Sequence, residues 1–249
     1  RVGKGTPAGE LLRRYWHPVC VSGELTDENP IKRVRILGEN LVAFRMPLKE
    51  GESKYRYGLV GEQCSHRSAS LAYGRVEENG IRCPYHGWLY AADGKCLETP
   101  PEPEDWAYKN EIEHTGYPVE KLGGLIWTYM GPQPVPLLPR WDCFAREDGK
   151  RVVYVESIME CNWLQPMENS VDPSHLYWLH GYRYGSGHLI DPVQQEKRQA
   201  QYQEKHEFIP FEYGIMKRRI TPHGTDEHPL LFPCALRHVS GERGKANPL

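Results

Sequence analysis

The chain reads Cys64-Ser65-His66, then sixteen further residues, then Cys83-Pro84-Tyr85-His86-Gly87-Trp88. Each of these two short segments supplies one thiol and one imidazole, side chains that bind zinc and iron readily. Because both segments carry one ligand of each kind, the pattern indicates one metal centre held by two loops. The surrounding strands are therefore expected to bring the two loops to a single point.

Two kinds of metal centre use two Cys and two His. In a Rieske two-iron two-sulfur cluster, two thiolates hold one iron and two imidazoles hold the other. A structural zinc site usually groups Cys with Cys and His with His, at spacings unlike those of Cys64, His66, Cys83 and His86. The mixed pairing therefore favours the two-iron cluster, with zinc as the alternative.

Length, charge and Cys usage narrow the possible functions. The 249 residues are enough for two domains, and a net charge of −2 gives no reason to expect nucleic acid or an anionic membrane as a partner. No run of about 18 apolar residues occurs, so a membrane-spanning helix is not expected. Of the seven Cys, those outside the two loops form an odd, scattered set typical of reduced thiols. Together these features predict a soluble cytoplasmic protein.

The first part of the chain predicts a small antiparallel β domain. Thr6-Pro7 is a good helix start, and an apolar stripe predicts that this helix continues to Pro18. Asn79-Gly80 and Asp93-Gly94 are hairpin signals on either side of the second loop. Runs of branched and aromatic residues predict strands at 31–37, 41–45, 57–62 and 123–129. Both ligand pairs would then lie at strand ends, where loops can converge on a metal.

Four prolines between Pro132 and Pro139 predict a stiff connector, so we place a domain boundary after residue 140. Beyond it, residues 152–157 are expected to form a strand. The charged stretch that follows Asp191 is expected to be solvated surface, and residues 208–220 to be partly β.

A second candidate site lies between Cys161 and His180. Asp172-Pro173 predicts a fresh helix start, which places Asp172 about one turn before His175. On a regular helix His175 and His180 would diverge by about 140°, but unwinding at the following glycine would bring the two rings together. Two His and an Asp are more often ordinary helix residues. Beside an electron carrier, however, two His and a carboxylate fit the ligand set of oxygen-activating non-haem iron.

These motifs together resemble the oxygenase α component of Rieske non-haem iron aromatic ring-hydroxylating oxygenases, most closely the phthalate dioxygenase-like and O-demethylase-like branch. The resemblance covers essentially the whole chain and rests on residues 5–18, the two loops, residues 162–180 and residues 228–233. Ser65 and Ser68 stand where the family more often has Pro and Gly. Respiratory Rieske proteins carry an extra Cys in each loop, where this chain has Ala69 and Tyr85.

The resemblance implies an α+β fold. Residues 1–140 would form an antiparallel β Rieske domain, and residues 141–249 would form the first part of a helix-grip, START-like catalytic domain. The cluster ligands implied by the resemblance are Cys64, His66, Cys83 and His86. His175 and His180 would hold a mononuclear Fe(II), whose third carboxylate ligand is expected beyond residue 249.

The resemblance also implies a role for Asp172. In the family its counterpart joins the cluster of one subunit to the iron of the next, which implies a homotrimer or stacked trimers. Asp172 as a simple helix cap is the alternative interpretation, and both roles can hold at once.

An activity follows from the same resemblance. We find no nucleotide-binding fingerprint, so electrons would arrive from NAD(P)H through a separate flavin and iron–sulfur reductase. With O2, the protein would dihydroxylate, monooxygenate or O-demethylate a small aromatic substrate in aromatic catabolism. The branch suggests a carboxylated substrate, for which Arg183 and Arg218 are candidate partners. The alternative is a Rieske electron-transfer protein without oxygenase activity, although such a protein needs nothing like the segment from Asp172 to His180. The chain by itself is expected to be inactive.

Overall fold

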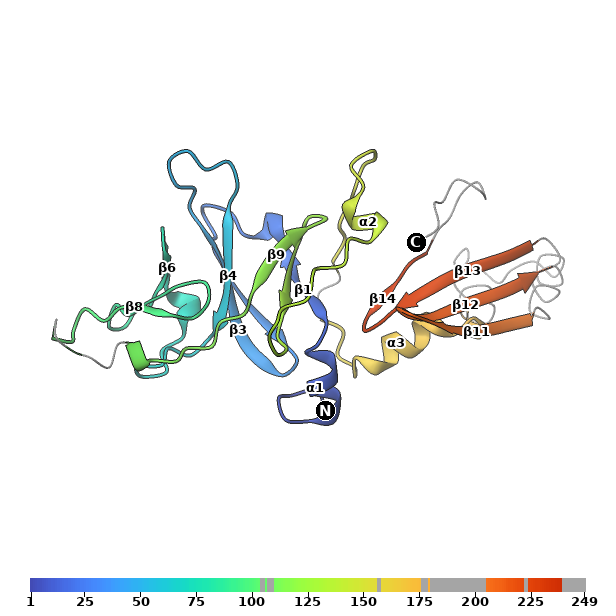
Figure 1. Cartoon of the computed structure of the whole chain (residues 1–249), viewed down its shortest axis with the longest axis horizontal. Coiled ribbons are helices and arrows are strands. Elements are labelled where there is room, and N and C mark those ends of the chain that lie inside the picture. Colours follow the sequence, from blue (N-terminus) through green and yellow to red (C-terminus); the bar gives the residue numbers. More distant parts are fainter. Residues whose placement is uncertain are drawn as a thin grey trace. The chain divides into compact units, whose positions relative to one another are not determined.

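The computed structural model describes residues 1–103, 106, 110–155, 158–175, 179, 205–221 and 224–238. Contacts divide the chain into two compact units, residues 1–154 and residues 155–248. Each unit is built on its own antiparallel sheets (Figure 1). Among the described residues, no helix is both long and apolar enough to cross a membrane.

Three small antiparallel sheets make up the first unit, as the sequence predicted. The first sheet has the order β1 (Trp16–Val21), β10 (Leu125–Tyr129), β9 (Val119–Leu122). The second contains β2 (Ile31–Ile36), β3 (Glu39–Met46) and β4 (Arg56–Gly61). The third contains β5 (Arg75–Glu77), β6 (Gly80–Arg82), β7 (Leu89–Tyr90) and β8 (Cys96–Glu98). Short helical segments are α1 (Pro7–Leu12), η1 (Ser22–Glu24), η2 (Leu71–Tyr73) and α2 (Asp142–Ala145).

The N-terminal helix begins as predicted but ends earlier. The Thr6 hydroxyl accepts a hydrogen bond from the amide of Gly9 at 3.2 Å, which caps α1. The expected continuation to Pro18 is wrong, because α1 ends at Leu12 and β1 already begins at Trp16. Strand β1 is at the edge of its sheet and its register shifts after Pro18, so the missing amide of this proline is tolerated.

The hairpin before the second ligand loop is confirmed. Strands β5 and β6 pair with Glu77 opposite Gly80. Gly80 is required by close packing, because a Cβ there would lie 1.9 Å from the carbonyl oxygen of Tyr90. Cys83 follows β6 directly, and Cys64 follows β4 after a short gap, so both ligand segments start at strand ends.

The two Cys of these loops are part of the protein core. Cys64 and Cys83 are 2 % and 3 % exposed, and they pack in one apolar cluster with Phe44, Trp88 and Tyr90. Full burial of side chains of this size contributes roughly 1.5–3 kcal/mol each. The packing around the loops is therefore a substantial part of the stability of the first unit.

The proline-rich segment packs on the first unit. The indole of Trp16 donates a hydrogen bond to the carbonyl of Pro136 at 3.0 Å, and Leu138 is buried in the same apolar cluster as Trp16. The chain divides after Tyr154, and the assignment of residues 1–140 and 141–249 to two functional domains stays a prediction.

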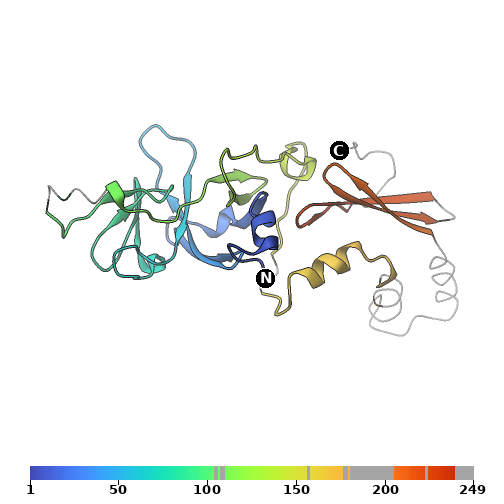
Figure 2. The same ribbon diagram turned by 60° about the horizontal axis from the view of Figure 1, so that its bottom comes forward.

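The second unit combines a helix with a four-stranded antiparallel meander, and Figure 2 shows α3 on one side of that sheet. Its elements are α3 (Leu164–Val171), β11 (Lys205–Phe211), β12 (Gly214–Thr221), β13 (Gly224–Leu231) and β14 (Ala235–Leu236). Strands β11 and β12 confirm the predicted β segment. The strand expected over residues 152–157 is wrong for its described part, since residues 152–155 are exposed and pair with no strand among the described residues.

Candidate functional site

The two ligand loops share one backbone framework. In each loop the amide of the Cys donates to the carbonyl five residues later, at 2.9 Å after Cys64 and 2.8 Å after Cys83. The Cys carbonyl accepts from the amide four residues later, at 2.8 and 3.1 Å. That fourth residue is Ser68 in the first loop and Gly87 in the second, and both have positive φ values, 56° and 73°. Two different sequences therefore form the same tight loop.

The four predicted ligands come together as two pairs. The thiols of Cys64 and Cys83 are in hydrogen-bonding contact, and the rings of His66 and His86 lie 4.6 Å apart between centroids. A two-iron cluster needs one sulfur pair and one nitrogen pair, whereas zinc needs its four ligands around one point. The geometry therefore fits the cluster better than the zinc alternative.

Two buried polar atoms at the loops support this fit. His66 Nδ1 and Trp88 Nε1 are buried without a hydrogen-bond partner in the described chain. The two rings stack in parallel, with 4.6 Å between centroids and 4° between planes. Such atoms cost free energy unless something satisfies them. A metal-binding nitrogen and an N–H donor are the groups that an iron–sulfur cluster would satisfy.

The two sulfurs have different surroundings. The Tyr90 hydroxyl lies 3.2 Å from Cys64 Sγ, while the backbone amides of Tyr85 and His86 hydrogen-bond to the Cys83 sulfur. Burial raises the pKa of the Cys83 thiol, and the two amides act against this rise. Burial and the neighbouring Cys64 raise the pKa of Tyr90, which keeps its O–H available as a donor to a thiolate.

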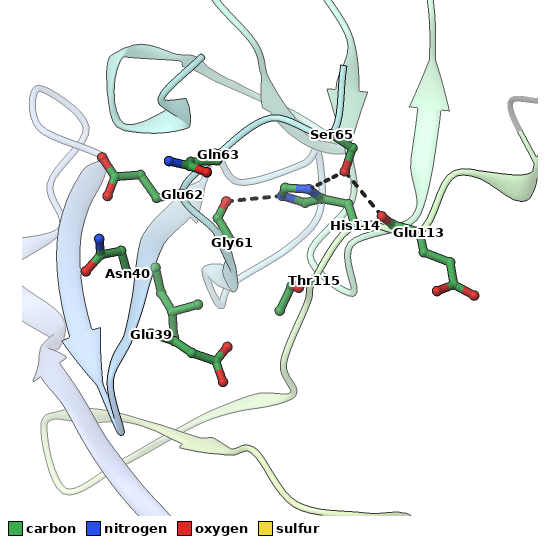
Figure 3. A pocket seen from close by; sticks show the side chains of 10 residues that line it. Glu39, Asn40, Gly61, Glu62, Gln63, Ser65, Glu113, His114 and Thr115 are labelled. Carbon is green, nitrogen blue, oxygen red and sulfur yellow. Dashed lines mark hydrogen bonds between the residues drawn. The ribbon is translucent and has the colours of Figure 1, made fainter. Parts of the chain in front are cut away.

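A histidine that sequence reasoning missed holds the first loop from outside (Figure 3). His114 Nε2 lies 3.1 Å from the carbonyl oxygen of Gly61, which can only accept, so Nε2 carries the proton. Burial lowers the pKa of His114, which favours the neutral ring. Its Nδ1 then accepts from the Ser65 hydroxyl at 3.0 Å, and the same hydroxyl lies 3.2 Å from the Glu113 carbonyl. The sequence signal that could have pointed to His114 was its partner Ser65, which stands where the family more often has Pro.

These residues line one side of a pocket of about 380 Å³. The opposite side carries Glu39 and Glu62, whose carboxylates are paired with Arg13 and Arg33. The pocket is therefore polar but its charges are largely compensated.

In the second unit, the predicted turn at Asp172 is confirmed. Its carboxylate accepts hydrogen bonds from the amides of Ser174 and His175, at 2.8 and 3.0 Å, and lies 3.1 Å from Nδ1 of the His175 ring. Burial would raise the pKa of Asp172, but the two amides and the His175 ring outweigh it, so the pKa is lowered. His180 lies outside the described residues, and its approach to His175 remains a prediction.

A buried cation near this turn was also missed. Lys217 on β12 is 6 % exposed, and its ammonium donates to the carbonyl of Ser170 at the end of α3, at 3.0 Å. Arg218, the candidate from sequence, hydrogen-bonds to Glu227 at 2.7 Å and to Glu207 at 3.2 Å. The sequence signal for Lys217 was the alternation of faces along a strand, because Lys217 and Arg218 are neighbours on β12 and therefore lie on opposite faces of the sheet.

Known proteins share the two loops and much of the remaining sequence. The Rieske 2Fe-2S domain family matches residues 15–123. The 5,5'-dehydrodivanillate O-demethylase oxygenase subunit of Sphingobium sp. is 41% identical over 246 residues, 92% of this chain and 52% of the relative. This chain belongs to the Rieske oxygenase α-subunit family. Within it, the chain falls in the phthalate dioxygenase and O-demethylase branch, as the resemblance predicted.

Two further relatives of this Rieske oxygenase chain bear on its function. The phenoxybenzoate dioxygenase subunit alpha of Ectopseudomonas oleovorans is 46% identical over 193 residues, 72% of this chain and 45% of the relative. A solved structure of the Pseudomonas putida CBB5 demethylase NdmA, a QL mutant with caffeine, matches with a TM-score of 0.68 and 26% identity, over 91% of this chain and 64% of that one. The chain spans about half the length of the curated relatives it matches.

Proposed function

We propose that this chain is the cluster-bearing part, and the first section of the catalytic part, of the oxygenase component of a multicomponent Rieske oxygenase. Such an enzyme uses reductase-supplied electrons and O2 to dihydroxylate, monooxygenate or O-demethylate an aromatic substrate. The observation that carries the proposal is the pair of equivalent loops that brings two buried thiols together and two imidazoles together. When bound, the cluster carries single electrons and the mononuclear iron activates O2.

Each loop residue has a distinct task in this proposal. Cys64 and Cys83 would hold one iron inside the core, where their burial excludes water. His66 and His86 would hold the other iron. The Tyr85 ring, 63 % exposed, lies 3.8 Å from the His86 ring between centroids, so this imidazole reaches toward the surface. The histidine side of the site is therefore the side nearer to solvent.

The second unit would begin the helix-grip catalytic domain. Its helix α3 and the antiparallel strands β11 to β14 are consistent with that architecture. His175 and His180 would bind the mononuclear iron, with a third carboxylate beyond residue 249. Asp172 already fixes the ring of His175, and an outer carboxylate of this kind orients a metal-binding histidine. In an assembled trimer or stack of trimers, Asp172 would also link this iron site to the cluster of a neighbouring subunit.

The contact between Asp172 and His175 favours an oxygenase over a pure electron-transfer protein, which has no use for it. Two relatives, the 5,5'-dehydrodivanillate O-demethylase oxygenase subunit and the phenoxybenzoate dioxygenase subunit alpha, act on aromatic carboxylates, which supports this substrate class. We further propose that the substrate is a carboxylated aromatic, that the electron donor is a separate flavin and iron–sulfur reductase, and that the protein is cytoplasmic.

The cluster assignment can be tested by electron paramagnetic resonance (EPR) of the full-length protein after reduction. We expect a Rieske-type signal in the wild type and its loss in His86→Cys. A four-sulfur ferredoxin signal, or stoichiometric zinc, in the wild type would contradict the proposal.

The role of Asp172 calls for a separate experiment. Full-length Asp172→Asn should keep a reducible cluster but lose most product formation from phenoxybenzoate or 5,5'-dehydrodivanillate, measured by mass spectrometry after turnover with ¹⁸O₂. Asp148→Asn is a matched control, because Asp148 is an exposed carboxylate that pairs only with Arg146 in the described structure. Normal turnover in Asp172→Asn would refute the bridging role.

A further inference from the structure

Lys217 is an unusual residue for the position it occupies. It lies in the central part of β12, opposite Phe208 on β11 and His228 on β13, and it is only 6 % exposed. Lysine is almost never buried to this extent without a compensating partner. Removing an ammonium from water costs several kcal/mol unless charge and hydrogen bonds replace the lost hydration.

Its charged neighbours on the same sheet are all compensated. Lys205, Arg218 and Arg219 each have a carboxylate within hydrogen-bonding distance, although all three are more exposed than Lys217. In the described part of the second unit, no carboxylate oxygen lies within 4.0 Å of the Lys217 ammonium. The most buried cation of this sheet is therefore the one that lacks an ion-pair partner there.

The partner that Lys217 does have brings it to the proposed iron site. Its ammonium donates to the carbonyl of Ser170, two residues before Asp172 and five before His175. Asp172 is the nearby acidic group, but its oxygens already accept from two amides and face the His175 ring. Burial and the like charge of Arg219 lower the pKa of Lys217, whereas the Asp172 carboxylate acts against this fall. Among the described residues, Asp172 offsets the charge of Lys217 only from beyond ion-pair distance, so an anion bound here would supply a direct partner.

A purely structural role must be considered beside this one. A cation at the last carbonyls of a helix is favourable, and Lys217 satisfies one such carbonyl of α3. That role needs a single N–H donor and little charge, whereas an ammonium has three donors. The structural role therefore leaves the burial of the full charge unexplained.

We propose that Lys217 is a specificity-determining residue whose ammonium pairs with the carboxylate of an aromatic substrate beside the Asp172–His175 turn. This inference rests on the proposed oxygenase function and names one of its binding contacts. Family membership alone does not supply it, since the solved demethylase that shares the fold has caffeine, a neutral heteroaromatic, as its ligand.

The test is equilibrium binding by calorimetry on the full-length oxygenase with its metals, using phenoxybenzoate and the matched neutral phenoxybenzamide. Lys217→Gln keeps an N–H donor for the Ser170 carbonyl but removes the charge. A hydrogen bond to a charged group contributes about 1.5–3 kcal/mol, so we expect carboxylate binding to weaken about 10- to 100-fold. Binding of the amide should change less than about twofold, and Lys217→Arg should restore most of the carboxylate affinity.

Lys205→Gln is the matched control, because Lys205 is a lysine on the neighbouring strand β11, is 72 % exposed and is paired with Glu207. It should leave both affinities unchanged. Equal weakening of acid and amide by Lys217→Gln would overturn the inference, as would wild-type protein that binds the amide but not the acid. Binding is measured without turnover, so a failure of the oxygenase function itself would be seen separately as an absent Rieske signal or absent product.

Discussion

The two cluster loops have the same backbone hydrogen bonds but are supported in different ways. The first loop adopts a left-handed conformation at Ser68, whereas the second has Gly87 at the equivalent position. An L-residue in that conformation costs roughly 1–2 kcal/mol, and glycine avoids the cost. The two loops therefore share a backbone conformation because both must provide the same ligand geometry, and not because their sequences are alike.

Their outside supports differ as well. Ser65 connects the first loop to His114 and Glu113, through a neutral hydrogen bond at the surface. The second loop is held by a charged side chain, because Arg82 donates to the Gly87 carbonyl at 2.6 Å while it also binds Glu77 and Glu98. The second loop should thus depend more strongly on electrostatics.

The largest effect is expected for Arg82→Met. The substitution removes the bond to the Gly87 carbonyl, takes this partner from Glu98 and leaves Glu77 with Arg75. The free energy of unfolding, measured by urea denaturation, should fall by about 2–3 kcal/mol. The matched control is Arg75→Met, since Arg75 also binds Glu77 but is 75% exposed, and it should cost less than about 1 kcal/mol. Equal effects of the two substitutions would contradict the proposed support.

The same network predicts a pH dependence. Hydrogen bonds from Arg82 and Arg75 lower the pKa of Glu77 from 4.5 to about 2. Because the folded-state pKa lies below the unfolded one, this stabilisation is present above pH 4.5 and is lost as the pH falls from 4.5 toward 2. The wild type should therefore lose more stability over this interval than Arg82→Met does.

A smaller effect is expected for Gly87→Ala. The added Cβ would meet only Pro100, at an ordinary contact distance of 3.5 Å, so the cost is conformational and about 1–2 kcal/mol. Gly149→Ala is the control, because it has no positive φ and nothing within 4 Å of the new Cβ. A neutral result for Gly87→Ala, measured by thermal unfolding, would mean that the loop can relax.

The sulfur environments predict a change in redox potential. Tyr90→Phe removes a donor to Cys64, which should disfavour the more negative reduced cluster. A hydrogen bond of about 1 kcal/mol corresponds to a fall of about 40 mV for one electron, measured by EPR-monitored titration. Tyr85→Phe should leave the potential unchanged, because Tyr85 approaches its sulfur through the backbone amide. If the redox potential shifted in Tyr85→Phe but not in Tyr90→Phe, the assignment of the Tyr90 hydroxyl as the side-chain donor would be wrong.

The smallest effect, with the opposite sign, is expected for Ser68→Gly. Relief of the left-handed conformation is partly offset by the greater freedom of glycine in the unfolded chain, so we expect a gain of about 0.5 kcal/mol. Thermal unfolding of Ser68→Gly and Gly87→Ala in one series measures the expected stabilisation and the expected destabilisation together. Destabilisation by Ser68→Gly would show that the serine side chain contributes more than its backbone costs.

Local sequence signals predicted much of the fold. The hairpin at Asn79-Gly80 was predictable because its turn chemistry is local, and so was the cap at Asp172, where the carboxylate serves amides two and three residues ahead. The meeting of the two Cys and of the two His was predictable because metal chemistry restricts the residue types, and their binding of a cluster stays a prediction. The family resemblance added the branch, which the comparisons confirmed.

Features that depend on contacts distant in sequence could not be predicted. Trp16 was assigned to a helix, because the strand that pairs with β1 lies more than a hundred residues later. His114 acts through Ser65, 49 residues before it, and Lys217 through Ser170, 47 residues before it. Neither residue belongs to a motif, so only the folded chain shows what each side chain contacts.

The position of β10 has a practical consequence for protein production. The family match ends at residue 123, but β10 begins at Leu125 and lies between β1 and β9 in its sheet. An expression clone cut at the end of the match would retain both outer strands and lose the strand that joins them. Extending the clone beyond Leu138 would also retain the Pro136 carbonyl, which accepts a hydrogen bond from the Trp16 indole. A stable isolated cluster module should therefore end well past the limit that sequence similarity sets.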